Sequence, residues 1–293
     1  MLLIKFFEDV YRIRRLSDAT ESAKRKHRMV IGLFSEFLGR PAEVDDLTDE
    51  KIALARAKWQ EPRPEKGKEG LAKRTAQSYA SLLIAQMSIA WSRDFVSYGP
   101  TLKPLKCPPK RPVIITRAQT AALFQAAAKM PYMVGQVPAS VWWPALFHVA
   151  YETGMRRGDL FKLEWENVDM KRRVVSWLAG KTLKFATRLI SHRCVDALAP
   201  MPRRPGPIFQ HPFCQARLFQ LQRHLCCYAG LPPTRDYGLQ ALRRKHGDLV
   251  REVSGIAAAS ESLQHSSQKV TSDFYTEDKL LDFASRLPDP RVA

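Results

Sequence analysis

The sequence has few cysteines, and their spacing excludes the usual cysteine-based sites. They are Cys107, Cys194, Cys214, Cys226 and Cys227. The number is odd, and no two are arranged as C-x-x-C, the spacing typical of zinc sites and dithiol redox centres. We therefore expect reduced cysteines, as in a cytosolic protein, and no metal site.

Long apolar runs are also missing. The opening MLLIKFF is interrupted by Glu8 and Asp9 before a signal-peptide core is complete, and nothing later approaches the roughly 20 apolar residues of a membrane span. Internal repeats and low-complexity tracts are absent. These features predict no membrane association and a location in the cytoplasm.

Acidic residues are outnumbered, with 29 against 47 basic residues and a formal net charge of +18. Residues 1–110 hold 21 basic and 14 acidic residues, and the remainder hold 26 and 15, so both halves are positive. This distribution predicts a protein that holds a polyanion between two lobes. The alternative is a solvated basic surface without a specific partner.

The length of 293 residues predicts two domains. Apolar residues at helical spacing predict two helices within 9–38, a third over 47–59 with Thr48 as its N-cap, and a fourth over 72–95. Five prolines in the segment 99–112 indicate an extended linker. We expect a helical domain over 1–100, a linker over 101–112 and a second domain over 113–293.

The second part reads as mostly helical with a small β element. Thr116 is expected to cap a helix that runs through Met130, and an apolar helix ends at Gly154. The alternating segment 173–190 predicts a hairpin or small sheet whose turn presents Lys181. Further helices are expected at about 214–229, 239–254 and beyond 270. The predicted fold class is mainly α with a small β-hairpin or sheet.

Three polar segments of this second part carry the functional signal. They read YETGMRRGDLFKLEW from residue 151, LQALRRKHGDLV from residue 239 and LQHSSQKVTSDFYTED from residue 263. In the first, Arg156 and Asp159 are expected on one face of the first turn of a helix, because they lie three residues apart.

Together these segments resemble the tyrosine recombinase (phage integrase) family. The family's first motif is matched by Thr153, Gly154, Arg156, Asp159 and Leu163. Its second motif is matched by Leu242, Arg243, Leu263, His265, Ser266, Ser267 and Tyr275. There are three departures: Gln240 stands where the family usually has a histidine, Gln264 replaces the usual glycine, and the spacing from histidine to tyrosine is one residue longer than is common.

The resemblance implies a reaction in which a tyrosine attacks a DNA phosphate. Arg156 and Arg243 would hold the two non-bridging oxygens, because the guanidinium is planar and always charged. Lys181 would protonate the leaving 5′ oxygen, with Lys184 as the alternative acid. Tyr275 would be the nucleophile and form a 3′-phosphotyrosine. Because this covalent link conserves the phosphodiester energy, no cofactor, ATP or metal ion is expected.

Other residues are given supporting roles by the same resemblance. His265 would donate to the phosphate or shuttle a proton. Asp159 would fix Arg156 or a neighbouring group, with a plain helix-terminal acid as the alternative. Gln240 would still hydrogen-bond to phosphate without transferring protons. DNA contacts in the N-terminal part are expected at Lys73, Arg74 and Gln77, with a solvated helix face as an equal alternative.

The resulting hypothesis is a site-specific DNA recombinase or integrase of a phage or other mobile element. Residues 1–100 would then be the DNA-binding domain and residues 113–293 the catalytic domain. The protein would bind double-stranded DNA near the nucleoid and act as a homo-tetramer on two DNA sites. Accessory DNA-bending proteins and exchange of the C-terminal segment between protomers are possible additions. Two alternatives stay open: a type IB topoisomerase-like strand transferase, and a catalytically inactive DNA-binding protein descended from a recombinase.

Overall fold

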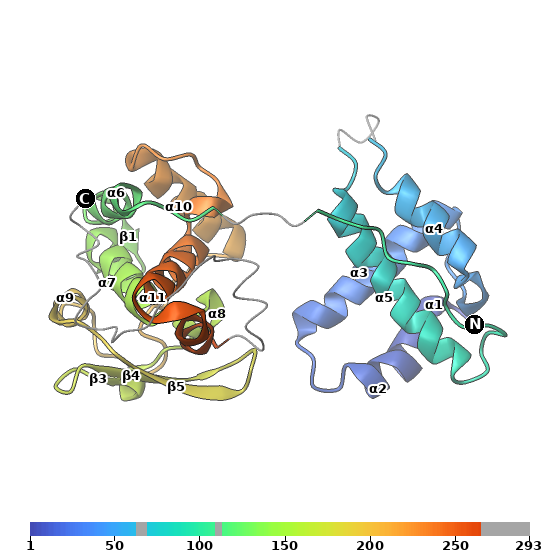
Figure 1. Cartoon of the computed structure of the whole chain (residues 1–293), viewed down its shortest axis with the longest axis horizontal. Helices are drawn as coiled ribbons and strands as arrows, with labels where there is room; N and C mark the ends of the chain where they lie inside the picture. Colours follow the sequence, from blue (N-terminus) through green and yellow to red (C-terminus); the bar gives the residue numbers. More distant parts are fainter. Residues whose placement is uncertain (63–68, 109–112, 265–293) are drawn as a thin grey trace. The chain divides into compact units, whose positions relative to one another are not determined.

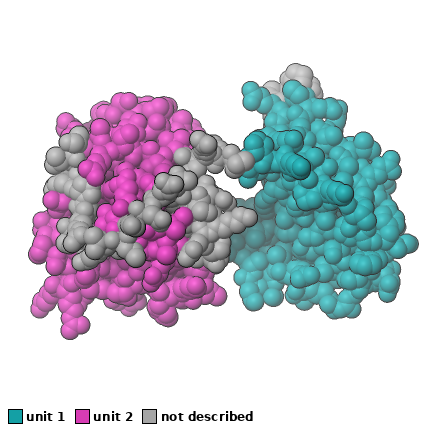
Figure 2. All heavy atoms as spheres, viewed as in Figure 1, with its two compact units in different colours: residues 1–108 teal, residues 109–293 magenta. Residues whose placement is uncertain are grey.

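The computed structural model describes residues 1–62, 69–108 and 113–264. The helix expected beyond residue 270, together with His265, Ser266, Ser267 and Tyr275, lies outside this range. The chain divides into two compact units, residues 1–108 and 109–293 (Figure 2). Each unit has its own apolar core.

Unit 1 is helical (Figure 1). Its elements are α1 (Leu3–Phe6), the π-helical turn η1 (Phe7–Tyr11), α2 (Arg12–Arg15), α3 (Glu21–Leu38), η2 (Val44–Asp46), α4 (Asp49–Lys58) and α5 (Lys73–Trp91). The helices predicted for this region are confirmed, and the Thr48 hydroxyl accepts from the Lys51 N–H at the start of α4. Large side chains such as Phe34 and Trp59 are fully buried where α3, α4 and α5 meet.

Residues 101–108 are the last part of unit 1 and lie against its helices α4 and α5. The Gln77 side-chain oxygen on α5 accepts from the Leu105 N–H at 2.9 Å, and Arg56 on α4 donates to the Lys103 carbonyl at 3.2 Å. The prolines prevent this segment from continuing a helix, and its extended backbone is satisfied by side chains of α4 and α5 instead. The domain limits of 1–100 and 113–293 with a linker between them stay a prediction.

Unit 2 combines helices with two small antiparallel sheets. Its helical elements are α6 (Arg117–Ala127), α7 (Ala139–Thr153), α8 (Arg157–Leu160), η4 (Trp165–Asn167), α9 (His192–Leu198), α10 (Gln215–Tyr228), η5 (Arg235–Tyr237) and α11 (Leu239–Ser262). Thr116 caps α6 with a full capping box, as predicted. Helix α7 is apolar on nearly all sides and is buried accordingly, packed against α11 (Figure 1).

The strands are β1 (Met133–Val134), β2 (Val137–Pro138), β3 (Val168–Asp169), β4 (Val174–Ala179) and β5 (Lys184–Leu189). Strands β1 and β2 pair with each other, and the second sheet has the order β3-β4-β5. The predicted hairpin is therefore confirmed, with residues 180–183 forming the turn between β4 and β5. The predicted fold class, mainly α with a small β element, is likewise confirmed.

Helix α11 is longer than the sequence predicts. Its expected end at residue 254 coincides with a break, because Gly255 adopts φ 77° and ψ 171°, but helix resumes and continues to Ser262. That backbone conformation is open almost only to glycine. The break redirects the last two turns of α11. These turns carry the carbonyl groups of Glu261 and Ser262, which accept hydrogen bonds from Arg188.

The first motif also differs in detail from the prediction. Helix α7 ends at Gly154, which has the left-handed φ of 63° expected of a C-cap glycine. The following helix, α8, is a single turn, and Arg156 is its N-cap residue with an extended backbone. The expectation that Arg156 lies within the first turn of this helix was therefore wrong, because the chain is still extended at Arg156 and the helix begins at the next residue.

Within the described residues, no helix is long and apolar enough to cross a membrane. No group of three or more histidine, cysteine or acidic side chains in that part of the chain is arranged to hold a metal ion. The five cysteines are all free thiols.

Candidate active site

The two motif arginines meet at the C-terminal end of α11. Arg156 Nη2 donates to the Gln264 carbonyl at 3.1 Å. Arg243, on α11 itself, donates through Nη2 to the Leu263 carbonyl and through Nη1 to the Gly154 carbonyl. Residues separated by up to 108 positions in the sequence are thus brought to one place, immediately before His265.

One nitrogen of Arg156 has no hydrogen-bond partner among the described residues. Arg156 Nη1 is buried and makes no hydrogen bond within the described part of the chain. A buried, unpaired guanidinium nitrogen is costly unless it binds an anion or water. The Arg243 side chain is itself only 5% exposed. The two arginines therefore form a preorganised cationic site, and Arg156 Nη1 can donate a further hydrogen bond there.

A buried histidine joins the end of α7 to the end of α11. His246 Nδ1 donates to the Tyr151 carbonyl at 2.8 Å, and Nε2 accepts from the Ser262 hydroxyl at 2.8 Å. Burial, opposed in part by the bond to Tyr151, lowers the pKa of His246 to about 3, so the ring is neutral at physiological pH. A β-carbon built on Gly154 would lie 2.5 Å from the ring, so only glycine fits at this position.

The predicted lysine turn is held by Asp159. Asp159 Oδ1 accepts from the Gly180 N–H at 3.0 Å, and Gly180 directly precedes Lys181. The carboxylate therefore acts on the hairpin, one of the neighbouring groups that the resemblance allowed, and no hydrogen bond to Arg156 is found. Lys181 and Lys184 are both exposed, at the two ends of the 180–183 turn, so the geometry does not choose between them.

Gln264, the residue that replaces the family's glycine, has a left-handed backbone with φ 50°. This conformation favours glycine, which accounts for the usual residue at this position. The glutamine side chain is buried, and its amide lies 3.5 Å from the Lys184 carbonyl at the start of β5, a long contact. Gln264 therefore contacts Arg156 through its backbone and the hairpin through its side chain.

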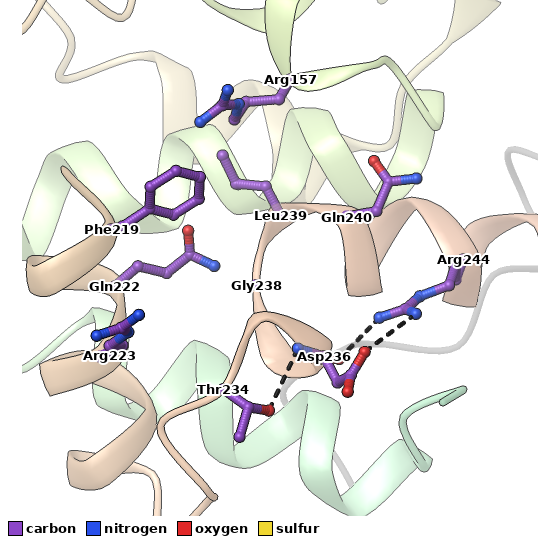
Figure 3. Close-up of a pocket in the computed structure, with 10 residues that line it drawn as sticks. All are labelled: Arg157, Phe219, Gln222, Arg223, Thr234, Asp236, Gly238, Leu239, Gln240 and Arg244. Carbon is purple, nitrogen blue, oxygen red and sulfur yellow. Dashed lines mark hydrogen bonds and ion pairs between the residues drawn. The ribbon is translucent and has the colours of Figure 1, made fainter. Parts of the chain in front are cut away.

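Gln240 lies beside a cavity near the start of α11, whereas Arg156 and Arg243 meet near its end. It is exposed in the first turn of α11 and lines a cavity of about 310 Å³ between α8, α10 and α11. Figure 3 shows this cavity, with Asp236 bonded to Arg244 and Thr234. The cavity is lined by Arg157, Phe219, Gln222, Arg223, Thr234, Asp236, Gly238, Leu239, Gln240 and Arg244. Three of these are arginines and one is acidic, so the cavity suits an anion.

The three DNA-contact candidates on unit 1 differ in exposure and in how many of their polar atoms already form hydrogen bonds within the unit. Gln77 uses its oxygen for Arg56 and Leu105 and its nitrogen for Ser81, so its amide is committed within the unit. Lys73 is exposed at the first residue of α5, and Arg74 is exposed with one bond to the Pro108 carbonyl. Both charges lie at the helix end where the dipole is already positive, which favours an anion nearby.

His265 and Tyr275 lie outside the described residues, so their placement in the site stays a prediction. One residue near the site was missed altogether. Arg188 donates through Nη2 to the Glu261 and Ser262 carbonyls at 3.3 and 3.1 Å. Its signal was present in the sequence: alternation along β5 places Arg188 between Ala186 and Ile190 on the core-facing side, where an isolated charge is unusual.

Residues 114–205 match the model of the Phage integrase family. This span includes Arg156, Asp159 and Lys181. This segment thus matches the phage integrase family, and the resemblance inferred from the motifs is confirmed. No curated protein sequence matches the chain.

Solved structures share the fold over nearly the whole chain. A Tn1549 transposon integrase in complex with transposon right end DNA is 14% identical with a TM-score of 0.74, covering 95% of this chain and 96% of its own. A lambda integrase dimer bound to a COC′ core site is 17% identical with a TM-score of 0.65, covering 93% and 94%. A lambda integrase tetramer bound to a Holliday junction is 16% identical with a TM-score of 0.67, covering 94% and 78%. The fold is that of the tyrosine recombinases.

Proposed function

We propose that the chain is a site-specific DNA recombinase that cleaves and rejoins DNA through a 3′-phosphotyrosine intermediate. The observation that carries this proposal is the meeting of Arg156 and Arg243 at the end of α11, directly before His265. Two arginines from distant segments, fixed in orientation by backbone carbonyls, are suited to a phosphate that becomes more negative during reaction.

The arginines would act by stabilising the pentacoordinate phosphorane. Their orientation is set in advance by the carbonyls of Gly154, Leu263 and Gln264, so little reorganisation is needed when charge develops. The unpaired Arg156 Nη1 gives one donor for a non-bridging oxygen. We expect the loss of either guanidinium to lower the cleavage rate by about two decades or more.

Proton transfer would be divided between the hairpin and the segment after α11. Lys181 donates to the leaving 5′ oxygen from a turn that Asp159 holds in place, with Lys184 as the alternative donor. His265 donates to the phosphate or shuttles a proton, and Tyr275 attacks. Gln240 takes the place of a family histidine and supplies a hydrogen bond without proton transfer.

DNA binding is supported by the charge of both units and by the cavity beside Gln240. The net charges of +7 for residues 1–110 and +11 for the remainder favour a polyanion on each unit. Because structures with the same fold are complexes with DNA, including a dimer on a core site and a tetramer on a Holliday junction, we propose a tetramer on two duplex sites. Its working location is then the cytoplasm, with its DNA.

The test is covalent capture on a nicked suicide duplex that carries the ends of the mobile element encoding the chain. Cleavage releases a short fragment, so the enzyme stays attached to the DNA and a denaturing gel detects the product. We expect an adduct with the wild type in the presence of a metal chelator, and none with Tyr275→Phe at equal DNA affinity. Salt-sensitive binding of a proven site without any adduct would instead favour the inactive DNA-binding protein.

A further inference from the structure

Strand β5 carries one partly buried charged side chain, that of Arg188, whereas Lys184 at the start of the strand is exposed. Phe185, Thr187 and Leu189 face outward, while Ala186 and Arg188 occupy the opposite face. A guanidinium on that face needs hydrogen-bond partners, because burying an unpaired charge is costly. Arg188 finds them in the Glu261 and Ser262 carbonyls, 3.3 and 3.1 Å away in the last turn of α11.

Those two carbonyls and the next two in the chain, at the C-terminal end of α11, all accept hydrogen bonds from arginine side chains. The last carbonyls of a helix have no intrahelical partner and form the negative end of its dipole. Here the carbonyls of residues 261 and 262 accept from Arg188, that of residue 263 from Arg243, and that of residue 264 from Arg156. The same helix end therefore positions both motif arginines and is tied to β5.

Arg188 is also mechanically connected to the lysine turn. It lies four residues after Lys184 on the same strand, and β5 is paired in register with β4 on the other side of the turn. The turn is fixed at its first residue by Asp159, through Gly180. Without Arg188, the outer strand of the hairpin keeps only the long Gln264 contact to the end of α11 among its described side-chain bonds.

We propose that Arg188 is a positioning residue, which aligns the lysine turn with the arginine pair by fastening β5 to the end of α11. This inference rests on the proposed function. It predicts that the loss of Arg188 impairs the protonation of the leaving group and spares DNA binding, because Arg188 acts through the position of Lys181 or Lys184.

The test is single-turnover cleavage by Arg188→Met, which keeps the apolar stem and removes the hydrogen bonds. The matched control is Arg172→Met, an arginine of the neighbouring β3–β4 turn whose side chain is 85% exposed. Each protein is assayed on the ordinary duplex and on one with a sulfur atom in place of the leaving 5′ oxygen. A thiolate leaves without protonation, since thiols are far more acidic than alcohols, so only defects in general acid catalysis are rescued.

We expect Arg188→Met to cleave the ordinary duplex about 10- to 100-fold more slowly than the wild type, by analogy with other small misplacements of catalytic groups. We expect its rate on the sulfur substrate to match the wild type, its DNA affinity to be unchanged, and Arg172→Met to behave as the wild type on both. Arg188→Lys, which can reach one carbonyl, should fall between the two and serves if Arg188→Met does not fold.

Two results would overturn the inference. One is a normal rate for Arg188→Met on the ordinary duplex, and the other is a defect of equal size on both substrates, which would indicate a role unconnected with the leaving group. A wild type that cleaves neither substrate, although it binds the site, would refute the proposed function itself, and the inference with it.

Discussion

At the scale of single residues, the site depends on the close contact of Gly154 with His246. Gly154→Ala would place a methyl group 2.5 Å from the His246 ring on a backbone with φ 63°. We expect a loss of at least about 2 kcal/mol, the sum of left-handed strain and overpacking. The measurement is urea unfolding of purified variants.

Gly230→Ala is the matched control for this prediction. Gly230 is in the same unit and also has a left-handed φ of 66°, but a β-carbon there would meet nothing within 4 Å. Only the strain term, about 1 kcal/mol, should be lost. Equal losses in the two variants would show that the contact with His246 is unimportant.

His246 also gives the stability a pH dependence. Its pKa in the folded chain is lowered from 6.5 to about 3, so the unfolded chain binds the proton first. The contribution of His246 to stability is therefore complete above about pH 6.5 and declines as the pH falls toward about 3. We expect His246→Asn to be less stable than the wild type at pH 7.5, with a difference that narrows by pH 4.5. A constant difference across this range would contradict the assignment.

Single residues also show which parts of the candidate site could be predicted from the sequence. Arg156 and Arg243 were found from their local motifs, and their meeting place could not be, because it is set by the packing of α7 against α11. Gln264 was noticed only as a departure, and its left-handed backbone supplies the reason for it. Arg188 was missed because a single arginine in a short strand resembles an exposed charge until the buried face of that strand is known.

At the scale of elements, the break in α11 decides where the arginine-binding carbonyls lie. Gly255 has φ 77° and ψ 171°, a conformation that alanine does not readily adopt. We expect Gly255→Ala to cost about 1–3 kcal/mol and to reduce cleavage, because relieving the strain would move residues 261–264. Urea unfolding and the suicide-duplex assay measure the two effects.

The control for the break is Gly158→Ala, within the single turn of α8. Gly158 has ordinary helical surroundings and nothing within 4 Å of its added β-carbon. Alanine should be neutral or stabilising there by up to about 1 kcal/mol. If both variants kept full stability and activity, the break would have no functional importance.

Elements were the level at which the sequence was most informative. The helices of unit 1, the capped helix at Thr116 and the hairpin around Lys181 all follow from apolar periodicity and capping residues. The continuation of α11 past Gly255 did not follow, because a glycine inside a helical pattern looks like an end. The single turn of α8 was likewise too short to define a period.

At the scale of the whole molecule, positive charge on both units predicts DNA binding that weakens steeply with salt. The logarithm of the binding constant should fall linearly with the logarithm of salt concentration. Lys73→Ala should reduce this slope by about one, the value for one lost phosphate contact. Binding isotherms measured at salt concentrations from about 50 to about 300 mM provide the test.

Gln77→Ala is the informative comparison for that experiment. Both ends of the Gln77 amide are engaged by Arg56, Leu105 and Ser81, so the variant should destabilise unit 1 and leave the salt slope unchanged. A slope that falls for Gln77→Ala and stays constant for Lys73→Ala would reverse the assignment of the DNA-facing positions on α5.

The most direct test of the central claim is to identify the residue and the DNA end joined in the covalent complex. The wild type would be trapped on the suicide duplex, digested with protease, and the DNA-linked peptide sequenced by mass spectrometry. We expect one adduct, at Tyr275, on a 3′ phosphate, with a free 5′ hydroxyl on the other strand end. An adduct at another residue, a 5′ linkage, or no adduct on a bound site would contradict it.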